Sequence, residues 1–268
     1  MTASTPLDLH VEVTGTGPVY ALLPPVGLGG WVWRPVAERL AGQRTVVAVD
    51  LPGYGSPSLP AGTPWTVHRF TDAVADFLAA RWPGPIDVAG VSLGGAIALE
   101  LARSGAARRA VAVSPIGFWS RAEARYAVAS LRLTQHVARL SRPVRSRLAH
   151  SPAARAVLLA QVAGRPRDVP AEATAAMARD VADAPFAATL PHTGRYHFTP
   201  SAGMGGRITV AWGTRDRLLP PRQARRARRA LPAARHVELP DAGHVPFWDT
   251  PQQLAALILD PALSGSGG

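Results

Sequence analysis

The stretch that decides the fold is PIDVAGVSLGGAIALEL, residues 85–101. Its first half favours a strand, and from Leu93 onward its apolar residues recur at helical spacing. Between the two halves, Gly90, Ser92 and Gly94 form the pattern G-x-S-x-G. A serine on so tight a strand-to-helix turn adopts a strained backbone, so its neighbours must lack bulk. The stretch therefore predicts an exposed, nucleophilic Ser92 beside the free N–H groups of a helix start.

The pattern is weak by itself. With Gly and Ser each at about 7% of residues, it arises by chance in roughly one chain in ten of this length. A closely packed glycine-rich turn, or a turn that binds phosphate, would have the same residues. The strand before it, the helix after it and the additional Gly95 favour the catalytic interpretation.

A serine nucleophile needs a base, and the base needs a carboxylate to orient it. Residues 207–221, RITVAWGTRDRLLPP, begin as an alternating strand, and Asp216 follows in a loop. Residues 236–251, HVELPDAGHVPFWDTP, also begin as a short strand, and His244 lies in the loop after it. Ligands of open parallel sheets bind just past the carboxyl ends of strands. Asp216 and His244 are therefore the candidate acid and base.

Other residues compete for these roles. Glu238 falls inside the last strand, and Asp241 is so near His244 along the chain that it cannot easily reach across. His192 and His197 lie close together, but no Cys or acidic cluster accompanies them, so we expect no metal there. Asp216 remains the favoured acid.

Four motifs, each at the expected place along the chain, resemble the α/β-hydrolase superfamily over nearly the whole chain. They are GVSLGG at 90–95, GTRDRLLP at 213–220, DAGHVPFWDTP at 241–251, and DLPGYGSP at 50–57. The last is similar to the family's D-x-x-G-x-G-x-S loop, with proline in the final place. The resemblance implies Ser92 as nucleophile, His244 as base and Asp216 as orienting acid.

The oxyanion hole departs from the family's pattern. The resemblance implies that the N–H of Leu93 is one donor and that a loop after an early strand gives the other. The family usually has His-Gly in that loop, whereas this chain has Pro24 and Pro25, which lack an N–H. If the prolines occupy the His-Gly places, Val26 donates. If the loop is two residues shorter, Leu28 donates. Val26 is the favoured donor, and Leu28 is the open alternative.

The pattern along the chain predicts an α/β fold. We expect a mostly parallel eight-stranded sheet with flanking helices, whose first part spans residues 1–115 and whose second part spans 206–263. Residues 116–205 show no strand pattern and predict a helical cap inserted after the sixth strand. Residues 264–268 form a low-complexity, flexible tail. The cap's apolar residues at helical spacing are Tyr126, Leu131, Leu133, Val137 and Leu140.

Composition restricts the partners. The net charge is +11, yet every basic residue is Arg and none is Lys, which fits a GC-rich coding bias better than selection for nucleic acid. No apolar run approaches 18 residues, and the N-terminus lacks a basic-then-apolar leader, so we expect no membrane partner, no signal peptide and a cytoplasmic protein. The absence of cysteine excludes disulfides and thiolate catalysis. The oligomeric state is not determined by the sequence.

These observations predict a serine hydrolase that cleaves an ester-like bond of a small, mostly apolar substrate through an acyl-enzyme, without a cofactor. Trp119, Leu218 and Val245 are the expected substrate-lining residues. A lactonase, a carbon–carbon bond hydrolase, a perhydrolase-like enzyme and a biosynthetic cyclase are alternatives on the same fold. Outside enzymes, a ligand receptor with slow turnover is the alternative.

Overall fold

The computed structural model describes residues 6–201, 204 and 206–260. Its centre is a seven-stranded sheet in the order β1-β3-β2-β4-β5-β6-β7, in which only β1 runs antiparallel to its neighbour among the described strands. The strands are β1 (Val11–Thr14), β2 (Val19–Leu23), β3 (Thr45–Val49), β4 (Ile86–Val91), β5 (Ala107–Val113), β6 (Ile208–Gly213) and β7 (Arg235–Leu239). The predicted α/β fold is confirmed.

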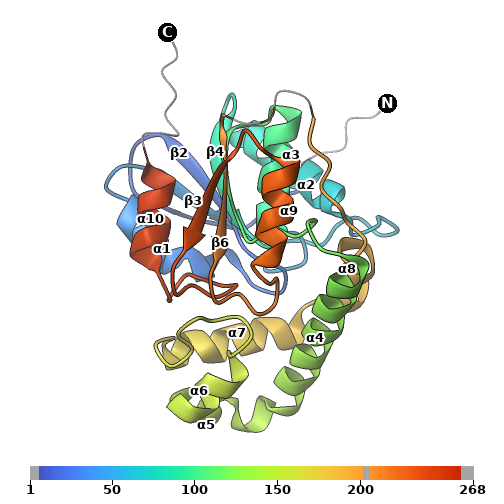
Figure 1. The fold of residues 1–268 in the computed structure, drawn as a ribbon, viewed down its shortest axis with the longest axis vertical. Coiled ribbons are helices and arrows are strands. Elements are labelled where there is room, and N and C mark those ends of the chain that lie inside the picture. Colours follow the sequence, from blue (N-terminus) through green and yellow to red (C-terminus); the bar gives the residue numbers. More distant parts are fainter. Residues whose placement is uncertain (1–5, 202–203, 205, 261–268) are drawn as a thin grey trace.

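Helices cover both faces of the sheet (Figure 1). On one face lie α1 (Arg34–Leu40), which follows the short 3₁₀ turn η1 (Gly30–Trp33), and α10 (Pro251–Leu259). On the other face lie α2 (Val67–Arg81), α3 (Leu93–Ser104) and α9 (Arg222–Ala230). Because both faces are covered, every residue of β4 and of β6 is buried.

The sheet has seven strands among the described residues, and the prediction of eight was wrong in this count. The chain pairs as a strand only from Val11, not from Leu7. Before that point the backbone of His10 binds loop atoms: its N–H donates to Ser56 Oγ, and its carbonyl accepts from Asp50 N–H. Five strands precede the helical insert, which follows β5 and not a sixth strand as expected.

The insert contains helices and no strand among its described residues. Its elements are α4 (Arg121–Leu140), the 3₁₀ turn η2 (Arg142–Val144), α5 (Arg145–His150), α6 (Pro152–Leu158), α7 (Ala171–Asp183) and α8 (Phe186–Thr193). A capping box between Ser120 and Glu123 begins α4. Figure 1 shows these helices beyond one end of the sheet. The predicted tail, 264–268, lies outside the described residues.

The apolar residues that predict α4 do not all face the core. Four of the five, Tyr126, Leu133, Val137 and Leu140, are exposed. The side of α4 that packs inward has smaller and polar residues, including Ala124, Ala127 and Gln135. The spacing thus predicted the helix correctly but did not indicate which of its faces is buried.

Candidate active site

Ser92 lies where β4 ends and α3 begins, and it is buried rather than exposed as expected. Its backbone has φ +58° and ψ −112°, a conformation that residues with a side chain rarely adopt. A methyl group at Gly90 would lie 2.1 Å from the carbonyl oxygen of Gly94, and one at Gly94 would lie 2.3 Å from that of Leu23. The G-x-S-x-G pattern is therefore required by the close approach of backbone on both sides of the serine.

Asp216 and His244 lie together in the loops after β6 and β7. His244 Nδ1 is 2.8 Å from Asp216 Oδ2, and both side chains are almost fully buried. The other oxygen, Asp216 Oδ1, accepts hydrogen bonds from the backbone N–H groups of Leu218 at 3.0 Å and Leu219 at 2.8 Å. These contacts fix the carboxylate, which in turn fixes the imidazole ring.

The rival acids lie elsewhere. Glu238 is exposed on β7, and Asp241 forms a surface ion pair with Arg215 at 2.6 Å. Among the described residues the structure thus places Asp216, and neither rival, at the ring of His244.

The second ring nitrogen of His244 is not engaged by another group in the described part of the chain. Nε2 is buried and has no hydrogen-bond partner among the described residues. Ser92 and His244 line the same cavity, whose volume is about 380 Å³. Hydrogen bonds between a catalytic base and its nucleophile are often long in a free enzyme and shorten when substrate binds. The arrangement leaves one imidazole nitrogen free to accept a proton.

Two of the three predicted lining residues are in this cavity. Leu218 and Val245 line it, together with apolar side chains from α4, α6 and α7. Trp119 instead lines a neighbouring cavity of about 20 Å³ beside Ser92, and its indole N–H donates to the Tyr196 carbonyl at 2.9 Å. Leu218 borders both cavities.

The loop after β2 approaches Ser92 from the other side. Its residues Pro25 to Leu28 form a turn in which Leu28 N–H donates to the Pro25 carbonyl at 3.4 Å. The N–H of Val26 has no acceptor in the described part of the chain, and Val26 lines both cavities beside Ser92. Leu93 begins α3, so its N–H also lacks a partner within the helix. Of the two candidates in this loop, the geometry leaves Val26 free and not Leu28.

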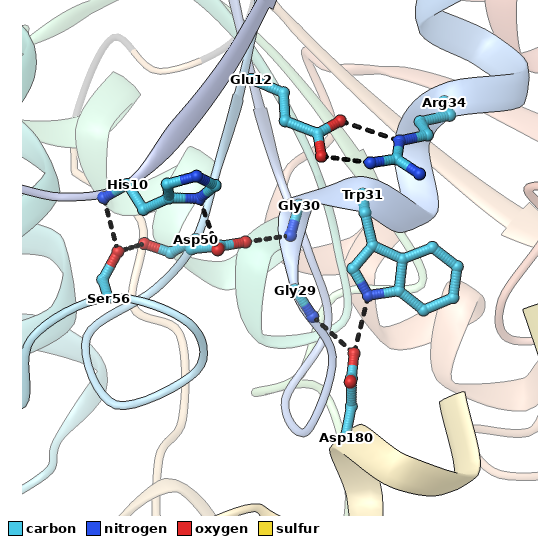
Figure 2. Close-up of polar contacts among 9 residues, drawn as sticks. All are labelled: His10, Glu12, Gly29, Gly30, Trp31, Arg34, Asp50, Ser56 and Asp180. Carbon is cyan, nitrogen blue, oxygen red and sulfur yellow. Dashed lines mark hydrogen bonds and ion pairs between the residues drawn. The ribbon is translucent and has the colours of Figure 1, made fainter. Parts of the chain in front are cut away.

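Asp50 holds this loop from the side of the sheet (Figure 2). Its Oδ1 accepts from the N–H of Gly30, and its Oδ2 lies 2.9 Å from His10 Nδ1. Ser56 Oγ donates to the Asp50 carbonyl at 2.8 Å. Asp50 and Ser56 belong to the DLPGYGSP motif, so the motif's role here is to anchor the loop after β2.

Asp180 holds the same loop from the side of the insert (Figure 2). It lies on α7, and its Oδ2 accepts from the indole N–H of Trp31 at 2.7 Å and from the N–H of Gly29 at 3.4 Å. Burial raises the pKa of Asp180 above its ordinary value, although these two donors oppose the rise. Nothing in the sequence pattern indicated this residue.

Asp249 connects the insert to the loop that carries His244. Its carboxylate accepts three backbone N–H groups, from Gly243 at 2.8 Å, Gly164 at 2.7 Å and Arg165 at 2.8 Å. A methyl group at Gly164 would lie 1.9 Å from the Asp241 carbonyl oxygen, so the two loops are in direct contact. Asp249 belongs to the DAGHVPFWDTP motif, but the sequence pattern did not indicate this role.

The described residues contain neither a metal-binding cluster nor a membrane-spanning helix. No group of three or more His, Asp or Glu side chains among them could hold a metal ion. None of the helices in that part of the chain is both long and apolar enough to cross a membrane.

Comparison with known proteins agrees with this geometry. Residues 21–257 match the sequence model of the "Alpha/beta hydrolase family". The chain is 32% identical to a pimeloyl-[acyl-carrier protein] methyl ester esterase of Chromobacterium violaceum, over 95% of this chain and 98% of that protein. A protein of the same name from Nitrosomonas europaea is 28% identical, over 93% and 97% of the two chains. The solved structure of a thermophilic esterase from Thermogutta terrifontis is similar in fold, with a TM-score of 0.72, 23% identity and coverage of 96% and 94%.

Proposed function

Because the chain belongs to the alpha/beta hydrolase family, we propose that it is a serine esterase with Ser92 as nucleophile, His244 as base and Asp216 as orienting acid. One observation carries the proposal. His244 is hydrogen-bonded to Asp216, its Nε2 has no partner among the described residues, and it lines the same cavity as Ser92. The relatives are named esterases, in agreement with the predicted carboxylesterase-like hydrolase.

The proposed reaction begins when Ser92 Oγ attacks the ester carbonyl and His244 Nε2 takes the serine proton. Asp216 stabilises the imidazolium that forms. The N–H groups of Val26 and Leu93 donate to the oxyanion of the tetrahedral intermediate. His244 then gives its proton to the leaving alcohol as the carbon–oxygen bond breaks. Water, deprotonated by His244, attacks the acyl-serine, and the free acid and Ser92 are released.

The helical insert, residues 116–205, serves in this proposal as a cap over the site. Its helices supply much of the wall of a cavity whose lining is mostly apolar. A volume of about 380 Å³ is in the range of small-molecule pockets, roughly 300–1,000 Å³. We therefore assign the acyl part of a small, mostly apolar ester to this cavity.

A fluorophosphonate probe tests the assignment of Ser92, because it phosphonylates only an activated serine. Mass spectrometry should find the adduct on the peptide that contains Ser92, and the Ser92→Ala protein should not react. Turnover on matched esters, lactones and vinylogous diketones then separates an esterase from the other reactions. An adduct at another residue, or labelling without turnover of any ester, would refute the proposal; the second result would favour the slow ligand receptor.

A second candidate is an esterase whose acyl substrate is carried by an acidic protein, and the surface of the insert favours it. Residues 121–170 contain ten arginines and only two acidic residues. At the cavity, the lining residues Leu133 and Val157 are 63% and 77% exposed. Arg145 is the one arginine among the described residues that lines the cavity. An arginine-rich surface beside an apolar opening suits an acyl chain that extends from an acidic partner.

This candidate predicts that kcat/KM for a methyl ester is higher when its acyl chain is attached to an acidic carrier protein than when it is free. Charge reversal of Arg147, which is exposed, should reduce only the carrier-dependent gain. Equal kcat/KM for the free and the carried ester would exclude it and leave the first candidate intact.

A further inference from the structure

The loop between β2 and η1 has few backbone partners of its own. The turn from Pro25 to Leu28 contains one internal hydrogen bond, and Gly30 N–H is held by the Asp50 side chain. Groups from the insert complete its surroundings. A methyl group at Gly27 would lie 2.7 Å from the ring of Phe186 at the start of α8. The position of the loop therefore depends on how the insert packs against it.

Asp180 is the polar contact in this packing, and its setting is unfavourable for a carboxylate. It lies in the last turn of α7, where the helix dipole disfavours a negative charge. Partial burial and the nearby Asp50 carboxylate both raise its pKa, and only the neighbouring Arg179 and the two N–H donors act in the opposite sense. The favourable contacts of this carboxylate are the hydrogen bonds that it accepts from Trp31 and Gly29.

These two donors flank the residue that Asp50 holds. Figure 2 shows the segment 29–31 between two carboxylates, those of Asp50 and Asp180. The two aspartates come from different parts of the chain. Val26 precedes Gly29 by three positions in the chain, so a shift of Gly29 would displace the Val26 N–H. Donors to an oxyanion act only when they lie about 2.7–3.1 Å from its position.

We propose that Asp180 is a positioning residue of the esterase site: through Gly29 and Trp31 it holds the Val26 N–H where the oxyanion forms. The insert then has a part in catalysis as well as in lining the cavity. This inference rests on the proposed function, because it takes Val26 as an oxyanion donor. It adds a residue of α7 whose side chain does not line the cavity.

The test compares Asp180→Ala, Asp180→Asn and the matched control Asp183→Ala on p-nitrophenyl butyrate. Asp183 is on the same helix, is exposed, and pairs with Arg142 at the surface. We expect Asp180→Ala to lower kcat about tenfold, less than the 10²–10³-fold loss for a deleted donor, with little change in KM. Asp180→Asn keeps an acceptor oxygen and should restore most of the rate. Asp183→Ala should match the wild type.

The Ki of a trifluoromethyl ketone distinguishes a positioning role of Asp180 from a general loosening of the protein. This inhibitor forms a tetrahedral adduct with the serine and places an oxyanion in the hole. Its Ki should rise in proportion to the loss of kcat/KM in Asp180→Ala, whereas the Ki of the product butyrate should stay constant. If Asp180→Ala does not fold, Trp31→Phe, which removes one donor, takes its place.

The outcomes separate the two proposals. If Ser92→Ala keeps its activity, the proposed function fails. If Ser92→Ala is inactive while Asp180→Ala keeps both the wild-type kcat and the wild-type Ki, only the positioning role of Asp180 is overturned. A fall in kcat without a rise in the trifluoromethyl ketone Ki overturns it as well.

Discussion

Replacing Asp216 by asparagine tests the core of the site, because the structure determines how the new amide must lie. In the native protein Oδ1 accepts two backbone N–H groups and Oδ2 faces His244 Nδ1. An amide NH₂ in the Oδ1 position would oppose two N–H donors. The asparagine oxygen must therefore stay at that position, and its NH₂ must face the imidazole.

That orientation forces the wrong tautomer on His244. With an NH₂ donor against it, Nδ1 has to be the acceptor, so the proton resides on Nε2, the nitrogen proposed as the base. Nε2 can then no longer take a proton from Ser92. A triad with its histidine in this tautomer loses on the order of 10⁴ in kcat, which corresponds to about 5.5 kcal/mol of transition-state stabilisation.

Steady-state hydrolysis of p-nitrophenyl butyrate measures this loss, and thermal melting checks the fold. We expect Asp216→Asn to keep KM and the melting temperature near the wild-type values, since the two N–H donors keep their acceptor. Asp241→Asn is the matched control, because Asp241 pairs with Arg215 at the surface. An Asp216→Asn enzyme that retains more than a tenth of the wild-type kcat would refute the assignment of the acid.

Three further predictions concern separate parts of the site. Ser92→Ala should reduce kcat by roughly 10⁴-fold or more in the ester assay and leave the melting temperature unchanged, since the hydroxyl contributes no core packing. Val26→Pro should lose about 10²–10³-fold in kcat, while Val26→Ala, which keeps the N–H, should stay near wild type. A folded Val26→Pro enzyme at full rate, together with an impaired Leu28→Pro enzyme, would assign the oxyanion donor to Leu28. The raised pKa of Asp180 means that the folded state binds this proton more tightly than the unfolded chain, so the free energy of unfolding should fall as pH rises from 3.8 through the raised value. Urea denaturation across pH should show that Asp180→Asn removes this fall.

The elbow could be predicted from the sequence because its determinants are local. Gly90 and Gly94 flank Ser92 within five residues, and their absent side chains are required by backbone approaches of 2.1 and 2.3 Å. Asp216 and His244 could be predicted because each follows a recognisable strand, and parallel strands bring their carboxyl ends to one edge of the sheet.

The contacts of the insert could not be predicted. Trp31 and Asp180 are 149 positions apart, and no periodicity links them. Apolar spacing indicated a helix over 121–140, but the face of α4 with the largest apolar side chains is exposed. Which face is buried depends on where the insert docks, and local pattern does not encode this. The turn that engages the Leu28 N–H and leaves the Val26 N–H without an acceptor among the described residues was likewise not evident from the sequence.

Four aspartates of the candidate site and its surroundings share one physical role. Loops that leave the ends of strands have backbone N–H groups without ladder partners, and buried N–H groups need acceptors. Asp216 binds two such groups, Asp249 three, and Asp50 and Asp180 one each. A carboxylate just after a strand is therefore weak evidence for a triad acid, because it is first an anchor for loops. What distinguishes Asp216 is its second oxygen, which remains available after the backbone is satisfied and lies 2.8 Å from the imidazole of His244.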